Sequence, residues 1–201
     1  MFCPETDCYE NQTFADVDFR EAALKRIQFI RCRFRACRME ELATDHCTFS
    51  GCDFTFARLG GSVHKYSAFL NCQFSSASLF GAEMTDCKCT GSSFSGADLT
   101  GLTLTRGNYA YTCFAECNLR GMDLRDIVFA NADLRGAKLQ KTNLRGADLT
   151  HALLGGALLA DTDLREASLA GVDMRSVQFQ KTKIDIAQAV VIAEALGAVV
   201  F

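Results

Sequence analysis

Apolar residues recur at every fifth position over most of the chain. Counting in steps of five from Phe14 to Ile184 gives 35 positions, and 31 of them are leucine, phenylalanine, methionine or isoleucine. The exceptions are Thr44, His64, Cys89 and Tyr109. Because the frame never slips, residues 12 to 184 form one continuous array of five-residue units.

A second regularity lies two positions before each central apolar residue. There, 29 of the 35 residues are alanine, cysteine, serine, threonine, valine or glycine. Residues two apart point to the same side of an extended segment, and the residue between them points to the other side. Each unit therefore predicts a very short strand that buries one large and one small side chain.

Glycine marks the end of many units. Eleven of the fifteen glycines lie two positions after a central residue, where a turn needs a permissive backbone. An α-helix is excluded, because a five-residue step advances about 500° at 3.6 residues per turn and the central residues would not form a stripe. Short strands separated by corners predict a β-solenoid, in which stacked coils build a core that no single unit could bury alone.

The pattern changes after Ile184. Asp185 is a good N-cap, apolar residues follow at helical spacing, and Gly197 is a natural stop, so we expect one helix that closes the repeat. The residues at helical spacing are Ile186, Ala189, Val190, Ala193 and Leu196, with Ile186, Ala189 and Ala193 expected to face inward.

Further apolar residues in this tail exceed what a cap requires. A second helical stripe and a short apolar strand at the end are expected to meet a second copy of the chain. The predicted dimer interface consists of Val191, Ile192, Ala198, Val199, Val200 and Phe201.

Charge and composition narrow the possible functions. The chain has 21 basic and 24 acidic residues, so its formal net charge of -3 gives no footprint for nucleic acid or for an anionic membrane. The first eleven residues lack the apolar run of a signal peptide, and no stretch approaches the roughly 20 apolar residues that span a bilayer. We therefore expect a cytoplasmic protein that neither binds DNA directly nor enters a membrane.

The eleven cysteines are explained by their place in the repeat. Seven occupy the small inward position: Cys32, Cys37, Cys47, Cys52, Cys72, Cys87 and Cys117. A nucleophile at Cys47 or a metal site at Cys87-x-Cys89 is disfavoured, because these side chains are directed inward and no matching second pair of ligands exists. Since no phosphate-binding loop or zinc-protease motif occurs either, we expect no enzyme, no cofactor and no metal.

Two polar residues take central positions. Thr44 and His64 lie twenty residues apart, which places them on the same wall of adjacent coils if four units make one coil. A polar side chain in a core needs a hydrogen-bond partner, so we expect these two to form an interior pair.

The repeat resembles the pentapeptide-repeat family. The A(D/N)LXX motif of that family is closely met at residues 97–99, 132–134 and 147–149, and the likeness covers about 85% of the chain. The resemblance implies a right-handed quadrilateral β-helix of four units per coil, to which the tail adds the short C-terminal capping and dimerisation helix expected from its own sequence. At about 4.8 Å per stacked strand, nearly nine coils would form a rod on the order of 40 Å long.

The tail resembles that of the quinolone-resistance group of this family, the MfpA and Qnr proteins. In that group a K-x-D-x-x-Q-A segment and a terminal L-G-x-x-V accompany a two-fold dimer contact. The matching residues here are Lys183, Asp185, Gln188, Ala189, Leu196, Gly197 and Val200. The resemblance implies a homodimer that binds DNA gyrase or topoisomerase IV as a rod-shaped mimic of duplex DNA, and the unbroken frame favours the loopless MfpA-like form.

Contacts with a partner have to come from outward positions. Nine acids precede and ten bases follow central residues, and such neighbours should largely cancel at long range, unlike the uniformly negative surface of DNA. Large apolar side chains also point outward. The candidate contacts are Phe56, Tyr66, Phe80, Tyr111, Asp98, Asp123, Asp133 and Asp148.

These expectations define three segments and two functions. Residues 1–11 are expected to form an N-terminal leader or cap, residues 12–184 the β-helix, and residues 185–201 a helix and strand that dimerise. The favoured function is non-enzymatic protection of DNA gyrase or another type II topoisomerase from inhibitors such as quinolones. The alternative is a structural or scaffolding repeat protein with an unrelated protein partner, which the nearly neutral faces favour.

Overall fold

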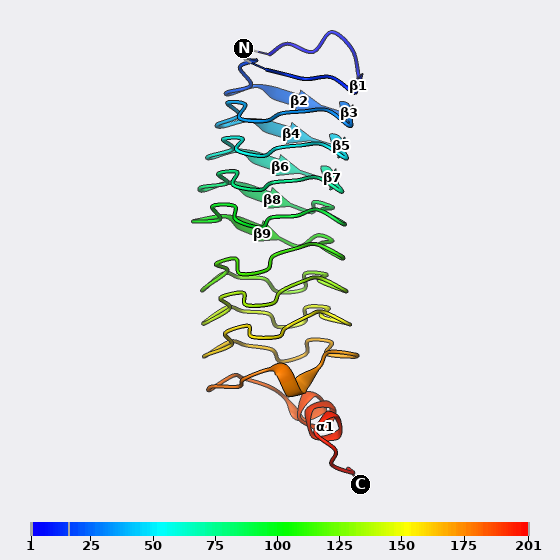
Figure 1. The fold of residues 1–201 in the computed structure, drawn as a ribbon, viewed down its shortest axis with the longest axis vertical. Helices are drawn as coiled ribbons and strands as arrows, with labels where there is room; N and C mark the ends of the chain where they lie inside the picture. Colours follow the sequence, from blue (N-terminus) through cyan, green and yellow to red (C-terminus); the bar gives the residue numbers. More distant parts are fainter. Residues whose placement is uncertain (1, 16, 201) are drawn as a thin grey trace.

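Coils of twenty residues stack into a rod (Figure 1). The structure, a computed structural model, describes residues 2–15 and 17–200. Parallel pairing at an offset of twenty residues joins Cys8 to Gln28 near one end and Asp163 to Lys183 near the other. Four five-residue units therefore make one coil, the paired segment has the length of nearly nine coils, and the predicted β-helix is confirmed.

Regular strands are three residues long because a corner interrupts every unit. One sheet has the order β1-β3-β5-β7, with β1 Cys8–Glu10, β3 Gln28–Ile30, β5 Thr48–Ser50 and β7 Ala68–Leu70. The other has the order β2-β4-β6-β8-β9, with β2 Ala23–Lys25, β4 Ala43–Asp45, β6 Val63–Lys65, β8 Glu83–Thr85 and β9 Thr103–Thr105. Isolated parallel bridges join most of the remaining units.

The corners have the backbone that the glycine pattern predicts. Up to Gly171, the described residues two positions after a central residue adopt φ values of 50 to 72°, which glycine reaches without strain. Other residue types occupy the same left-handed conformation, among them Phe56, Tyr66 and Tyr111. Their rings consequently project from the edges of the rod.

Phenylalanine fills the first coils as two stacked columns. Phe14, Phe34, Phe54, Phe74, Phe94 and Phe114 stack with ring centroids 4.6 to 4.9 Å apart. Tyr9, Phe29, Phe49 and Phe69 form the second column at 4.8 to 5.1 Å. The columns meet edge to face, as aromatic rings prefer, and leucine takes over most central positions further along the chain.

The two ends of the rod are closed differently. Phe2 packs over the first coil, with its ring centroid 4.4 Å from that of Phe19, and its N–H donates to the Asp18 carbonyl. Since β1 begins at Cys8, the last residues of the predicted leader belong to the sheet. At the other end the chain forms a short 3₁₀ helix η1, Met174–Ser176, and the helix α1, Ile186–Ala195.

The face of α1 that meets the rod differs from the prediction. Gln188 is buried and its Nε2 donates to the Ala167 carbonyl at 3.0 Å, while Ile192 and Ala195 pack against the core. Ile186, predicted to face inward, is 85% exposed. Apolar spacing alone misassigned the face, because polar bonds to the last coil fix the rotation of the helix.

Those polar bonds begin at the N-cap. Asp185 forms a reciprocal capping box with Gln188, and its second carboxylate oxygen accepts the N–H of Glu166 at 2.7 Å. These bonds hold the pKa of Asp185 below its usual value. Residues 198–200, expected to form a strand, have no regular secondary structure.

Cysteine burial follows the predicted frame. Eight of the eleven cysteines are buried, whereas Cys3 and Cys8 are exposed and Cys113 is half-buried. Burial raises the pKa of the Cys87 and Cys117 thiols to about 11, so both stay protonated at neutral pH. The thiol of Cys72 donates to the Phe49 carbonyl one coil earlier.

Thiol labelling checks this arrangement. Iodoacetamide applied to the native protein should modify only Cys3, Cys8 and Cys113, because the other thiols are buried. Mass spectrometry should find all eleven cysteines modified after unfolding in guanidinium. Rapid native labelling of Cys52 or Cys72 would show that the interior is open.

The predicted Thr44–His64 pair lies in a buried polar cluster. Thr44 Oγ1 lies 2.8 Å from His64 Nδ1, and Ser62 Oγ lies 2.9 Å from His64 Nε2. Thr44 also donates to Ser67 Oγ at 3.0 Å. Both ring nitrogens therefore have hydroxyl partners, and none of these partners can neutralise a positive charge on the ring.

The cluster predicts a pH-dependent stability. Burial lowers the pKa of His64 to about 4, whereas an unfolded histidine titrates near 6.5. The unfolded chain then binds more protons between these values, so stability is complete above pH 6.5 and falls as the pH is lowered toward 4, by about 3 kcal/mol in total. Denaturant titrations of the wild type and His64→Leu at pH 7 and pH 4 measure this loss.

The variant isolates the histidine from other acid effects. His64→Leu should lack this part of the pH dependence, because leucine cannot bind a proton. The neighbouring hydroxyls stay bonded in the variant, since Thr44 keeps its bond to Ser67 and Ser62 keeps its bond to the Leu59 carbonyl. Replacing the exposed His46 with glutamine should leave the dependence intact. Equal pH profiles for the wild type and His64→Leu would exclude a buried neutral histidine.

Candidate protein-binding surface

The outer walls carry ladders of ion pairs within single units. Pairs between the residues before and after a centre join Asp18 to Arg20, Asp123 to Arg125, Asp133 to Arg135 and Asp163 to Arg165, with N–O distances of 2.6 to 2.7 Å. Hydrogen bonds from the arginines hold the pKa of these aspartates below the usual value. The predicted local cancellation of charge is confirmed for these pairs, and exposed pairs of this kind contribute little to stability.

The aromatic candidates do not form one patch. Phe56, Tyr66, Phe80 and Tyr111 are 51 to 64% exposed. In the twenty-residue frame they occupy four different corners of the rod. Phe56 has a neighbouring cation, because the Arg35 guanidinium lies 5.1 Å from its ring centroid.

The acidic candidates are equally dispersed. Asp98, Asp123, Asp133 and Asp148 belong to four different walls, as their positions within the twenty-residue coil show. Asp98 and Asp148 each accept the N–H two residues ahead, from Thr100 and Thr150. A partner that touches one wall therefore meets only one of the four aspartates.

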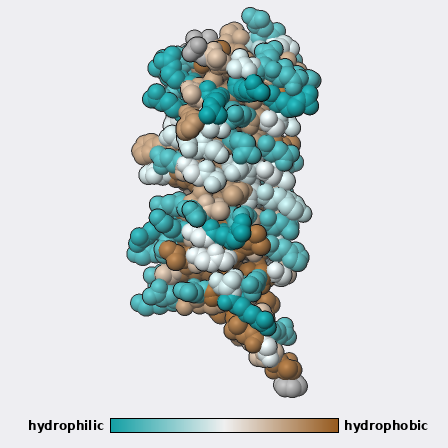
Figure 2. All heavy atoms as spheres, in the orientation of Figure 1, coloured by the Kyte–Doolittle hydropathy of each residue, from teal (hydrophilic) through white to brown (hydrophobic). Residues whose placement is uncertain are grey.

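Exposed apolar side chains instead gather at the C-terminal end. We define the apolar end as Phe179, Ile184, Ile186, Leu196, Val199 and Val200, which are 36 to 85% exposed. Figure 2 shows the hydrophobic surface around the protruding tip of the chain. A surface of this kind is typical of a protein interface.

The apolar end agrees only in part with the predicted dimer residues. Ala198, Val199 and Val200 are exposed, and Val191 is 37% exposed. Ile192 packs against the core of its own chain and is only partly accessible. Phe201 lies outside the described residues.

Sequence reasoning missed two members of this end, Phe179 and Ile184. Both occupy central positions, which are buried elsewhere in the array, but no further coil among the described residues covers their outer sides. Their place in the last coil was the available signal, since a solenoid end exposes its core unless another element covers it.

Neither a metal-binding cluster nor a membrane-spanning helix is found in the described part of the chain. Within residues 2–15 and 17–200, no three His, Cys, Asp or Glu side chains are grouped so that they could hold a metal ion. No helix in the same part of the chain combines the length and apolar character needed to cross a bilayer.

Comparisons with known proteins agree with the architecture. The family described as pentapeptide repeats matches residues 72–108, 112–150 and 147–184, with eight copies. No curated protein matches the sequence.

Several solved structures share the rod. A trypsin-treated variant of QnrB1, described as a plasmid-mediated fluoroquinolone resistance protein, has a TM-score of 0.71 and 22% identity, over 96% of this chain and 98% of its own. Full-length QnrB1 has a TM-score of 0.60 and 21% identity, over 95% and 97%. HetL, a pentapeptide-repeat protein involved in heterocyst differentiation regulation in the cyanobacterium Nostoc, has a TM-score of 0.49 and 20% identity, over 88% and 84%.

Proposed function

The chain belongs to the pentapeptide-repeat family, and from this premise we propose that it binds DNA gyrase or topoisomerase IV and protects the enzyme from fluoroquinolones. The supporting observation is the shared rod, since this chain and QnrB1 superpose over nearly the whole of both. The protein acts without catalysis, in the cytoplasm, by occupying a surface of its target.

Shape, more than charge, carries this interaction. Duplex DNA presents about one negative charge per 1.7 Å of its axis, whereas the walls of this rod carry carboxylates paired with arginines. A rod of regular width can enter a channel made for duplex DNA, but its paired charges gain little from a cationic channel. We therefore expect binding that depends less on salt than DNA binding does.

We propose further that the protein acts as a homodimer joined through the apolar end. Six exposed apolar residues at one end of the rod favour an isologous contact, in which the same patch of two copies meets itself. Two rods, each about 40 Å long, then make an assembly about 80 Å long. Such a length suits a two-fold symmetric enzyme that grips DNA at both halves.

The alternative function is a scaffold for an unrelated protein. The nearly neutral walls favour it, because DNA mimicry by charge needs an excess of acids that the chain lacks. The two functions differ in whether the target is a topoisomerase.

Direct binding distinguishes them. Purified protein is titrated into assembled gyrase and, separately, topoisomerase IV, and complex formation is followed by light scattering or calorimetry. The proposal expects a saturable complex that linear duplex DNA displaces. Absence of a complex with both enzymes at micromolar concentrations would leave the scaffold function.

A further inference from the structure

The backbone ladder is interrupted on one side of the rod. Asp98 pairs with Ser78 in the preceding coil, and Asn118 pairs with Lys138 in the following one, but Asp98 and Asn118 are not paired with each other. Among the described residues, no backbone hydrogen bond joins residues 98–106 to residues 118–126. The same coils stay joined on another wall, where Tyr109 donates to the Val128 carbonyl at 2.7 Å. The opening is therefore a wedge.

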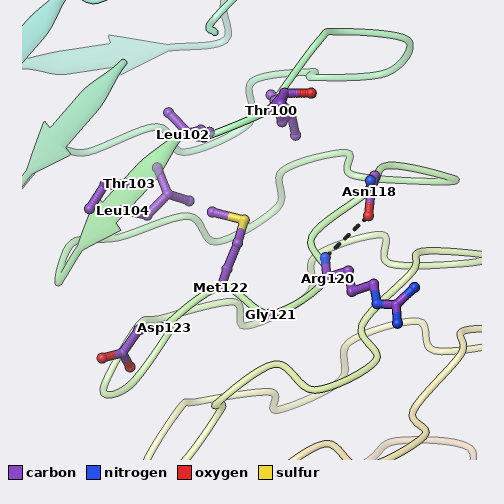
Figure 3. A pocket seen from close by; sticks show the side chains of 11 residues that line it. Thr100, Leu102, Thr103, Leu104, Asn118, Arg120, Gly121, Met122 and Asp123 are labelled. Atoms are coloured by element: carbon purple, nitrogen blue, oxygen red, sulfur yellow. Dashed lines mark hydrogen bonds between the residues drawn. The ribbon is translucent and has the colours of Figure 1, made fainter. Parts of the chain in front are cut away.

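The sequence explains where the wedge lies. Leu102 and Met122 occupy the small inward position in consecutive coils, where Ala82 precedes them and Thr142 follows. Two bulky side chains cannot stack in a slot repeated at the 4.8 Å spacing of strands, so the coils separate there. Figure 3 shows Met122 projecting from its coil toward Leu102 and Leu104 across the opening.

The wedge is accessible from outside. A cavity of about 450 Å³ lies between residues 99–104 and 118–123, and a second of about 360 Å³ continues between residues 103–106 and 123–126. The side chain of Asp123 is 54% exposed, against 21% for Asp133 and 14% for Asp163 in unbroken parts of the ladder.

The upper rim of the wedge is a free sheet edge in the middle of the rod. β9 is the last strand of its sheet and pairs with β8. One coil later, the N–H groups of Leu124 and Asp126 donate to the next coil. The equivalent N–H groups of Leu104 and Arg106 have no backbone acceptor in the part of the chain that the structure describes. An edge with free donors and acceptors is a template for another strand.

One cation beside the wedge is also without an ionic partner. Arg106 and Arg125 pair with Asp86 and Asp123, but among the described residues no carboxylate pairs with Arg120, which is exposed at the rim. An acidic group on an incoming segment would be its natural counterpart, because charge-assisted hydrogen bonds to carboxylates are the stronger kind.

We propose that the wedge is a binding site for an extended, acidic peptide segment of a partner protein, which adds as a strand to the free edge of β9 and places a carboxylate on Arg120. Main-chain bonds to Leu104 and Arg106 supply affinity, and Arg120 supplies the preference for an acid. This site is separate from the apolar end and does not depend on the proposed topoisomerase partner.

The test uses a random peptide-display library selected on the full-length protein. Enriched peptides should combine β-forming residues with at least one Asp or Glu, and their binding should slow amide exchange at Leu104 and Arg106. Their affinity should fall at least tenfold in Arg120→Gln. Arg20→Gln is the matched control, because Arg20 holds the same position in a coil without the wedge and should leave binding unchanged.

A second variant separates the site from the fold. Leu102→Ala combined with Met122→Thr restores residues that the neighbouring coils carry at this slot, so the ladder should close. The Leu104 and Arg106 amides should then be protected from exchange without a ligand, and peptide binding should be abolished. Two results would overturn the proposal. In the first, the selection yields no peptide with a dissociation constant below about 1 mM. In the second, the selected peptides bind the closed variant and Arg120→Gln as tightly as the wild type. The wedge would then be a water-filled defect only.

Discussion

Replacing Phe74 with alanine should lower the free energy of unfolding by about 3–5 kcal/mol. Phe74 is 1% exposed and stacks 4.8 Å from both Phe54 and Phe94, so truncation leaves a cavity inside an otherwise continuous column. Coils on either side cannot collapse into that cavity, since backbone ladders fix their spacing. Denaturant titration followed by circular dichroism measures the loss.

A matched substitution separates packing from aromatic content. Phe80 is 59% exposed, so Phe80→Ala should change stability by no more than about 0.5 kcal/mol. Phe74→Leu should lie between the two, because Leu134 and Leu154 already hold this position in later coils. A cost below about 1 kcal/mol for Phe74→Ala would contradict a tightly stacked column.

Charged replacement of Leu196 and Val199 should convert the protein to a monomer and abolish protection of gyrase. Both side chains are at least 60% exposed at the apolar end, so aspartates there leave the core intact but place like charges across an isologous contact. Light scattering should report half the mass of the wild type. The fold should persist, as shown by an unchanged circular dichroism spectrum.

The control for this variant is a charge placed elsewhere. Tyr111→Asp alters an exposed aromatic residue on a corner in the middle of the chain, away from the apolar end, and should leave the dimer unaffected. A monomeric Leu196→Asp/Val199→Asp protein that still shields gyrase fully would break the proposed link between dimer length and function. Binding by a single rod would then replace it.

The repeat made most of the fold predictable from sequence. A period of five fixes which residues point inward, so the burial of Phe74, the left-handed corner at Phe56 and the contact of Thr44 with His64 all follow from counting. The contact of Thr44 with His64 also needs the twenty-residue coil, which the family resemblance implies. Local pattern and global structure coincide in a solenoid to a degree that is rare in other folds.

The remaining features depend on interactions that a repeat does not encode. Gln188 turns α1 by bonding the Ala167 carbonyl, which exposes Ile186 and covers Ile192. The wedge arises because Leu102 and Met122 stand in consecutive coils, a relation visible only after the chain is folded into columns of twenty. The eight candidate contacts are dispersed because outward positions that look alike in sequence lie on four different walls and four different corners of the rod.

Protection itself tests the central claim most directly. Gyrase supercoiling of relaxed plasmid is measured at a fixed inhibitory concentration of ciprofloxacin while the protein is titrated from zero to several micromolar. The account predicts that supercoiling returns in a saturable manner and that the monomeric tail variant gives no rescue. Topoisomerase IV is assayed in parallel by decatenation. The proposal is contradicted if both enzymes stay inhibited at every concentration of the wild-type dimer.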